Sequence, residues 1–377
     1  MRYTGDDRGV ASRLGSDETK TSGSTPSQGS DPHVRTADYD YDLPSGLIAQ
    51  SPLEPRDSCR LLVVDRASGQ IDHRRFSDLG EYLEPGDLIV LNETRVLPAR
   101  LRGVKADSGG AAEVLLLRER GEDTWEALVK PGRRLQPGVK VSFGDGRLTG
   151  LIVAVLEESG GRLIQFTSHA GSVRQAVREL GEMPLPPYIT RPLDDPEKYQ
   201  TVFGTDERSA AAPTAGLHFT SAMLDRLTEG GVHTARVELD VGLDTFRPVS
   251  EEDPAEHHIH TERFRVPSWT AESVNDARSR GSKVVAIGTT SVRAIESSYD
   301  ESTGQVVAAE GNTDLFILPG FRFGAVDALV TNFHVPRSTL MMLVSAFAGR
   351  DLVMRAYATA IEERYRFLSF GDAMLIL

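Results

Sequence analysis

The sequence predicts an α/β protein whose body is a mostly parallel sheet flanked by helices, with a small β-barrel domain inserted into that body. From residue 220 onward, helical segments alternate with short apolar segments, as in strands joined by helical crossovers. Between residues 97 and 167, short β-type segments follow one another with Gly and Pro between them, which is typical of a barrel. The predicted parts are a disordered tail (1–38), an α/β body (39–96 plus 183–377) and the inserted barrel (97–182).

The tail and the bulk composition set the broad class of protein. Residues 1–38 are rich in Ser, Thr, Gly and Asp and hold few apolar side chains, so burial cannot offset the entropy of ordering them. The single cysteine, Cys59, excludes an intrachain disulfide and is expected to be a small buried side chain. The N-terminus lacks a signal-peptide pattern, and the longest apolar segment, 339–348, is too short to cross a membrane. We therefore expect a cytoplasmic protein with no membrane partner.

The first half of the ordered chain reads as a hairpin followed by the barrel. The β-type segments 61–65 and 71–76 flank a Ser-Gly turn, which predicts two antiparallel strands. Ser77 offers an N-cap to a short helix, and the apolar segment 88–91 after Pro-Gly-Asp predicts a buried strand. Ser172 precedes a helical segment that ends near residue 180. The predicted barrel strands are 112–117, 125–129, 139–143, 148–156 and 163–166.

The second half alternates helices and strands. Thr220 is an N-cap candidate, and Gly230-Gly231 ends the helix that it would begin. Gly281 ends another helical segment in the same way. The predicted helices are 220–229, 270–280, 291–299, 339–348 and 352–365, and the predicted strands between them are 232–239, 284–287 and 328–331.

Polar segments follow four of these strands. In open α/β sheets, ligands bind beyond the carboxyl ends of the strands, so four polar strand ends favour one shared site over scattered helix caps. The hydroxyls and N–H groups of segment 288–293 suit a carboxylate or phosphate, although an ordinary N-cap would look the same. The candidates are Asn92, Thr94 and Arg95; Gly242, Thr245 and Phe246; Thr289, Thr290 and Arg293; and Asn332 and His334.

A nearly uncharged segment, 210–219, is the most distinctive stretch of the chain. It places Pro213, Thr214, Gly216, His218 and Phe219 just before a helix N-terminus. Small residues admit close backbone approach, and a hydroxyl and an imidazole add polar contacts. The pattern predicts a binding loop for a small polar or anionic molecule, and a tight strand-to-helix connection is the alternative.

The segment 256–262 (EHHIHTE) resembles a metal site but is better interpreted as an acid–base pair. Residues 260, 262, 264 and 266 alternate as in a strand, which places His260 and Glu262 on the face of two apolar side chains. His257, His260 and Glu262 are therefore acid–base candidates, with purely structural polar groups as the alternative and no metal expected. Phosphate-binding Gly-Lys loops, dinucleotide-binding glycine motifs and Gly-x-Ser-x-Gly elbows do not occur in the sequence.

Net charge bears on nucleic-acid binding. A net charge of −13 argues against non-specific coating of nucleic acid, because such binding depends on positive potential. A few placed cations are nevertheless enough to contact phosphates. The most basic turn of the predicted barrel holds Lys130, Arg133 and Arg134, which are candidates for contacts with nucleic-acid phosphates or simply a solvated turn.

Six motifs together carry a family resemblance. They are 92–101 (NETRVLPARL), 183–189 (MPLPPYI), 199–203 (YQTVF), 211–219 (AAPTAGLHF), 288–293 (GTTSVR) and 331–334 (TNFH). With 41–44 (YDLP) and 365–374 (YRFLSFGDAM) at the two ends, the chain resembles the S-adenosylmethionine:tRNA ribosyltransferase-isomerases of queuosine biosynthesis. The resemblance implies transfer and isomerisation of the ribosyl group of S-adenosylmethionine onto 7-aminomethyl-7-deazaguanine at the tRNA wobble position. Epoxyqueuosine forms, adenine and methionine leave, and no metal or redox cofactor takes part.

The resemblance also implies roles for the candidates. His218, His257, His260 and Glu262 would exchange protons, and Arg293 with Thr289 and Thr290 would hold a carboxylate or phosphate. Asn92, Arg95, Asn332 and His334 would orient sugar or base, and the rings of Phe219 and Phe246 would face the sulfonium. We expect a monomer.

Three positions depart from the family pattern. Asp240 stands where a His is usual, Asp244 where a Gly is usual, and Leu318 where a Tyr is common. The added acids bear on the tRNA substrate more than on the use of S-adenosylmethionine, so ribosyl transfer to a small molecule without tRNA is one alternative. A non-catalytic tRNA-binding protein is the second alternative.

Overall fold

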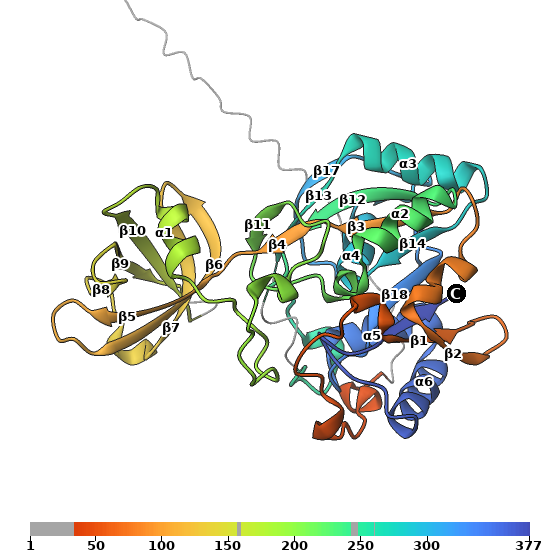
Figure 1. Cartoon of the computed structure of the whole chain (residues 1–377), viewed down its shortest axis with the longest axis horizontal. Coiled ribbons are helices and arrows are strands. Elements are labelled where there is room, and N and C mark those ends of the chain that lie inside the picture. The colour runs from red at the N-terminus through yellow and green to blue at the C-terminus, as the bar shows by residue number, and fades with distance from the viewer. Residues whose placement is uncertain (1–33, 157–159, 243–247, 260) are drawn as a thin grey trace, which may run out of the picture.

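The computed structural model describes residues 34–156, 160–242, 248–259 and 261–377. It has two parts, a large α/β body and a β-barrel that lies to one side of it (Figure 1). The predicted α/β architecture with an inserted barrel is confirmed. The chain enters the barrel after β4 (Thr94–Val96), which pairs in parallel with β11 (Asp206–Ser209) at the junction.

The barrel is a closed ring of six strands in the order β10-β7-β6-β5-β8-β9. Helix α1 (Val173–Leu180) packs against it and begins where the Ser172 hydroxyl accepts a hydrogen bond from the Gln175 N–H, as the sequence predicts. One strand, β5, has no counterpart in the prediction because its three basic residues and its glycine mask the alternation. The barrel strands are β5 (Arg100–Lys105), β6 (Ala111–Gly121), β7 (Thr124–Lys130), β8 (Lys140–Phe143), β9 (Leu148–Val155) and β10 (Arg162–Ser168).

The body is built on a nine-stranded sheet in the order β17-β13-β12-β3-β14-β18-β19-β1-β2. Its centre, β12-β3-β14-β18, is parallel, and β19 is parallel to β1. The other neighbours are antiparallel, so the sheet is mixed, with the expected parallel arrangement confined to its centre and to that one further pair. The strands are β1 (Arg60–Val64), β2 (Ile71–Arg75), β3 (Leu88–Asn92), β12 (His233–Leu239), β13 (Glu262–Val266), β14 (Val284–Ile287), β17 (Ala309–Thr313), β18 (Ala328–Asn332) and β19 (Ala373–Ile376).

Helices cover both faces of this sheet, and alternate strand residues point to the two covering layers. In β14, for example, Val284 and Ala286 join one apolar core, whereas Val285 and Ile287 join the other. The first core includes side chains of α3 (Ser268–Ser279), α4 (Thr289–Ser297), α5 (Thr339–Ala348) and α6 (Arg350–Glu362). The second includes side chains of η4 (Phe76–Tyr82), η7 (Thr214–His218) and α2 (Ser221–Glu229).

The remaining elements are short. They are the 3-10 helices η1 (Thr36–Tyr39), η2 (Ser45–Leu47), η3 (Arg56–Ser58), η5 (Gly132–Arg134), η6 (Pro196–Tyr199) and η9 (Pro254–Glu256), and the hairpin β15 (Tyr299–Asp300) and β16 (Gln305–Val306). The end of the predicted tail is ordered: Thr36 is buried and Val34 packs against the first core, so order begins before residue 39. Residues 1–33 lie outside the described residues. No helix in the described ranges is long and apolar enough to cross a membrane.

Candidate active site

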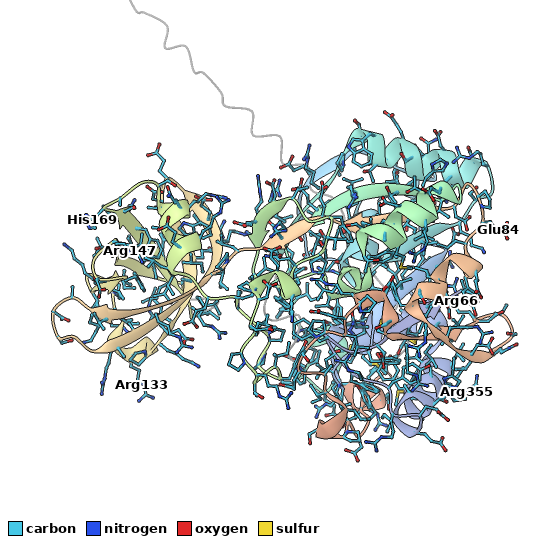
Figure 2. All side chains as sticks on the ribbon, in the orientation of Figure 1. Arg66, Glu84, Arg133, Arg147, His169 and Arg355 are labelled. Atoms are coloured by element: carbon cyan, nitrogen blue, oxygen red, sulfur yellow. The ribbon has the colours of Figure 1, made fainter. Side chains whose placement is uncertain are left out.

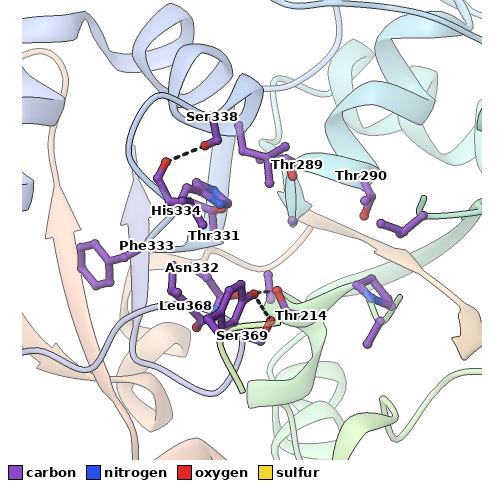
Figure 3. Close-up of a pocket in the computed structure, with 18 residues that line it drawn as sticks. Thr214, Thr289, Thr290, Thr331, Asn332, Phe333, His334, Ser338, Leu368 and Ser369 are labelled. Carbon is purple, nitrogen blue, oxygen red and sulfur yellow. Dashed lines mark hydrogen bonds between the residues drawn. The ribbon is translucent and has the colours of Figure 1, made fainter. Parts of the chain in front are cut away.

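One cavity lies at the carboxyl ends of β14 and β18 and is lined mostly by small polar groups. Its volume is about 40 Å³, and we call it the hydroxyl cavity. Figure 3 shows side chains from η7, α4 and the segments after β18 and before β19 arranged around it. Its polar lining comprises Tyr188, Thr214, Thr289, Thr290, Thr331, Asn332, His334, Ser338 and Ser369. Such a lining can donate and accept many hydrogen bonds without carrying a net charge.

The N-terminus of α4 opens onto this cavity. Helix α4 begins at Thr289, two residues before the predicted start, because Gly288 adopts φ 86° and turns the chain directly from β14 into the helix. Thr289 and Thr290 therefore line the cavity from the first turn of the helix. The Thr290 Oγ1 is buried and has no hydrogen-bond partner among the described residues. An orphan hydroxyl beside unpaired helix N–H groups is a favourable place for a polar or anionic ligand atom.

Asn332 is held by a hydrogen-bond network on the opposite side of the cavity. Its Oδ1 accepts a hydrogen bond from the Thr214 hydroxyl (3.0 Å). Its Nδ2 donates to the Leu368 carbonyl (3.1 Å) and to the His218 Nε2 (3.1 Å). The His218 ring proton then lies on Nδ1 and points at the Cys59 Sγ, 3.2 Å away. His218 thus contacts Asn332, which lines the cavity, but His218 itself does not line it.

Burial keeps both histidines at this site neutral. Desolvation, aided by the charges of Arg366 and Arg56, lowers the pKa of His218 to about 3. Desolvation alone lowers the pKa of His334 to about 3, and the His334 Nε2 shares a 2.8 Å hydrogen bond with the Thr331 hydroxyl. A neutral imidazole with so low a pKa is a poor proton acceptor near pH 7. The structure therefore favours a positioning role for His218 over the acid–base role expected from the sequence.

A second cavity of about 220 Å³ is charged, and we call it the ion-pair cavity. Its centre is a salt bridge between Arg293 on α4 and Glu262 on β13, both almost fully buried. The Glu262 Oε1 also accepts a hydrogen bond from the Gly242 N–H (2.7 Å). Around this pair the wall is largely apolar, with Ile259, Leu315, Phe316, Ile317, Leu340 and Leu343.

The two cavities adjoin. Val241 lines the hydroxyl cavity and Gly242 the ion-pair cavity, and Ser338 and Thr339 are divided in the same way. Leu340 lines both. Since Thr289 and Thr290 face one cavity and Arg293 the other, helix α4 serves both. The predicted anion site of Thr289, Thr290 and Arg293 is thus divided between two cavities.

His257 also reaches the ion-pair cavity. Its Nδ1 lies 2.9 Å from the Glu251 Oε2, and its ring is edge-on to Phe316. A backbone hydrogen bond and the hydrogen bond with His257 lower the pKa of Glu251 to about 2. This His–carboxylate pair suits proton transfer, with Glu251 in the place that the sequence suggested for Glu262. No cluster of metal-ligating side chains occurs among the described residues.

Several predicted ligand contacts have structural partners instead. Asn92 bridges β3 and β12 through the Leu239 backbone and also accepts from Thr94. Arg95 pairs with Glu197 at 2.7 Å. None of these side chains lines either cavity.

Two residues of the 210–219 loop serve packing. Phe219 is fully buried in the second core, edge-on to Phe76 and Phe203, so its ring does not reach a sulfonium in either cavity. At Gly216 an added Cβ would lie 2.7 Å from the Phe203 ring, so only glycine fits. Pro213 and Thr214 do line the hydroxyl cavity.

The other predicted residues lie elsewhere. Thr245, Phe246 and His260 fall outside the described residues, as does Asp244. Lys130, Arg133 and Arg134 are exposed on a barrel turn, with Arg133 at the edge of the barrel in Figure 2.

Sequence reasoning missed Tyr188, Ser338 and Ser369 in the hydroxyl cavity. The Tyr188 hydroxyl lies 2.7 Å from the Ser369 Oγ. Two of the three stand in motifs already noted, 183–189 and 365–374, in which proline and aromatic residues dominate the pattern. Ser338 is the N-cap of α5, so its hydroxyl has a structural role in addition to its place in the cavity lining.

The fold and the cavities define an α/β protein with an inserted barrel, built to hold a small polar molecule where its central strands end. The chain belongs to the queuosine biosynthesis protein family, whose family model matches residues 36–376.

Named relatives agree with this assignment. The chain is 57% identical over 344 residues to the S-adenosylmethionine:tRNA ribosyltransferase-isomerase of Symbiobacterium thermophilum, a match that covers 91% of this chain and 100% of the relative. The enzyme of the same name from Moorella thermoacetica is 52% identical, with the same coverage. The crystal structure of S-adenosylmethionine tRNA ribosyltransferase from Thermotoga maritima matches with a TM-score of 0.52 and 40% identity, covering 90% of this chain and all of that one.

Proposed function

We propose that this chain is an S-adenosylmethionine:tRNA ribosyltransferase-isomerase. It transfers the ribosyl group of S-adenosylmethionine to 7-aminomethyl-7-deazaguanine at the tRNA wobble position and rearranges it to the epoxycyclopentane of epoxyqueuosine. The observation that carries this proposal is the 57% identity to an enzyme of that name over the relative's whole length. The paired cavities at the strand ends support it, because their linings offer hydrogen-bonding groups and an ion pair to a polar ligand.

The reaction needs proton transfers and a fixed position of the sugar and base, and we assign these roles to described side chains. The positive sulfur acidifies the neighbouring 5′ carbon, so a base must remove a proton there, and the departing adenine must receive one. His257 with Glu251 is the His–carboxylate pair at the cavities. Thr214, Thr289, Thr290 and Asn332 hold the sugar and base in place for attack at the anomeric carbon. S-adenosylmethionine is consumed as a substrate, and we propose that no cofactor is needed.

The barrel is the proposed contact for tRNA phosphates. Lys130, Arg133 and Arg134 are exposed together on the turn after β7. Since the net charge of the chain is −13, a local basic turn has to supply the attraction for tRNA phosphates. We propose further that the protein works in the cytoplasm as a monomer.

The test is an assay with S-adenosylmethionine and tRNA carrying the deazaguanine precursor. The expected result is release of adenine and methionine with a matching increase in tRNA mass, followed by mass spectrometry. Adenine release without tRNA would indicate a small-molecule acceptor, and tRNA binding without adenine release would indicate a non-catalytic protein. Replacing Lys130, Arg133 and Arg134 by Gln is expected to raise the KM for tRNA and reduce its salt dependence, with kcat unchanged.

A further inference from the structure

We propose that the ion-pair cavity binds the amino-acid arm of S-adenosylmethionine, with its carboxylate on Arg293 and its ammonium on Glu262. The inference rests on the proposed function and adds to it a division of the substrate between the two cavities. A free α-amino acid group is a zwitterion, so a site for it needs a cation and an anion side by side. Arg293 and Glu262 form such a pair within the cavity wall.

Arg293 has a hydrogen-bond donor without an acceptor among the described residues. Its guanidinium donates from Nη1 to Glu262 and from Nε to the Leu315 carbonyl (3.0 Å), and the residue is only 6% exposed. The Nη2 is buried and has no acceptor among the described residues. A buried guanidinium N–H without an acceptor carries a desolvation penalty, which a ligand carboxylate relieves by accepting from it.

Glu262 supplies the opposite charge. One of its oxygens accepts from the Gly242 N–H and the other from Arg293, which fixes the carboxylate plane against the cavity. A carboxylate has about four lone-pair positions, so it can accept from an ammonium in addition to its protein partners. The apolar wall, including Leu340 and Leu343, suits the methylene groups that link the zwitterion to the sulfur.

The position of the pair matches the shape of the substrate. The cavities meet at Leu340 and at the chain steps 241–242 and 338–339. A nucleoside whose polar groups contact the hydroxyl cavity, with its amino-acid arm in the ion-pair cavity, has its sulfur near this junction. The methionine that leaves is then held by charges that the nucleoside does not contact.

Two ligands separate the arms of the substrate in a binding experiment. S-adenosyl-L-homocysteine carries both arms, whereas 5′-methylthioadenosine lacks the amino and carboxyl groups. By calorimetric titration, we expect the wild-type protein to bind the former about 10- to 100-fold tighter, the range of one or two charge-assisted hydrogen bonds. Glu262→Gln and Arg293→Lys are each expected to remove most of that preference and to leave the affinity for 5′-methylthioadenosine within about twofold.

Two further variants serve as controls for this experiment. Glu238→Gln is the matched control: it neutralises another buried carboxylate, paired with Arg263 and Arg265, that lines neither cavity, and it should keep the wild-type preference. The double variant Glu262→Met/Arg293→Met removes both charges together, so it should fold and bind both ligands alike even if the single variants unfold.

The outcomes separate this inference from the proposed function. Equal binding of the two ligands by the wild type, or a full preference in the folded double variant, would overturn the amino-acid site while leaving tRNA modification intact. Loss of the preference in Glu238→Gln would overturn it as well, because the effect would then not belong to this cavity. Absence of turnover in the tRNA assay would instead refute the proposed function.

Discussion

The two cavities share one helix and adjoin each other, yet they solve the problem of burying polar groups in opposite ways. The hydroxyl cavity uses neutral groups, and burial lowers the pKa of its two neighbouring histidines to about 3. The ion-pair cavity keeps a full positive and a full negative charge, because Arg293 and Glu262 neutralise each other. The contrast teaches that at these two cavities the fully charged side chains are the ones in contact with an opposite charge, whereas the titratable groups without one are neutral.

The two cavities differ in the stability that is lost when one buried polar group is removed. Removing one member of a buried ion pair leaves the other charge uncompensated, whereas removing a buried neutral group costs a hydrogen bond and some packing. Stability should therefore depend far more on single charges in the ion-pair cavity than on single hydroxyls in the other.

Arg293→Ala is expected to have the largest effect. It leaves the Glu262 carboxylate buried without its guanidinium, at a cost of about 3–5 kcal/mol in the free energy of unfolding. Urea denaturation at pH 7.5 measures this cost. The double variant Glu262→Met/Arg293→Met should lie within about 1–2 kcal/mol of the wild type. If the single variant were as stable as the double, the pair would not be the charged unit described above.

His218→Ala tests the neutral side of the comparison. It removes the acceptor for Asn332 and opens a space beside Cys59, which should cost about 2–4 kcal/mol at pH 7.5.

The stabilisation that His218 contributes depends on pH. His218 has a folded pKa of about 3, well below the ordinary value near 6.5, so the unfolded chain takes up a proton that the folded chain refuses. The stability that it contributes is complete above about pH 6.5 and is lost as the pH falls toward 3. The cost of His218→Ala should thus shrink from pH 7.5 to pH 4.5, and a constant cost would show that the folded chain protonates this ring as readily as the unfolded chain does.

The fold was largely predictable from local pattern. Five of the six barrel strands, the hairpin and the alternating second half carry periodicity or turn residues in the sequence, and Ser172 and Thr220 act as the N-caps that the sequence indicates. The mixed sheet was not predictable, because β19 inserts between β18 and β1 through contacts far apart in the chain. The strand β13 pairs antiparallel with β12 for the same reason.

The site was predictable in its location but not in its pairings. Polar residues after β14 and β18 do gather at one cavity, as expected for the ends of parallel strands. The salt bridge joins Glu262 and Arg293, which are 31 positions apart in the sequence, and no local spacing reveals it. Asn92 and Arg95 show the converse, since polar residues at a strand end can serve the fold alone.

Asp240→Asn tests a carboxylate that lies two residues before Gly242 of the ion-pair cavity and lacks a close counter-charge. Unlike Glu262, Asp240 has only a distant guanidinium, 4.0 Å away on Arg263, and its Oδ1 is buried with no partner among the described residues. Burial accordingly raises the pKa of Asp240 to about 6.

A raised pKa makes the ionised Asp240 a net cost. The folded chain binds this proton more tightly than the unfolded chain, so stability falls as the pH rises from about 4 to 6 and stays lower above that range. Asp240→Asn should raise the free energy of unfolding by about 1–3 kcal/mol at pH 7.5, with the gain vanishing near pH 4. Thermal unfolding across this range measures the difference, and a loss of stability at pH 7.5 would mean that Arg263 does compensate the charge.

Thr290→Val should have the smallest effect on stability and still impair binding. Valine has nearly the same shape, and the lost Oγ1 has no hydrogen-bond partner among the described residues, so the free energy of unfolding should change by less than about 0.5 kcal/mol. If a ligand atom satisfies that hydroxyl, the affinity for 5′-methylthioadenosine should fall about 2- to 10-fold, the value of one neutral hydrogen bond. Ser345→Ala is the matched control, since its buried hydroxyl also has no partner in the described ranges but lines neither cavity. Equal affinity in Thr290→Val and the wild type would show that the orphan hydroxyl does not face the ligand, and the contrast between the cavities would then concern stability alone.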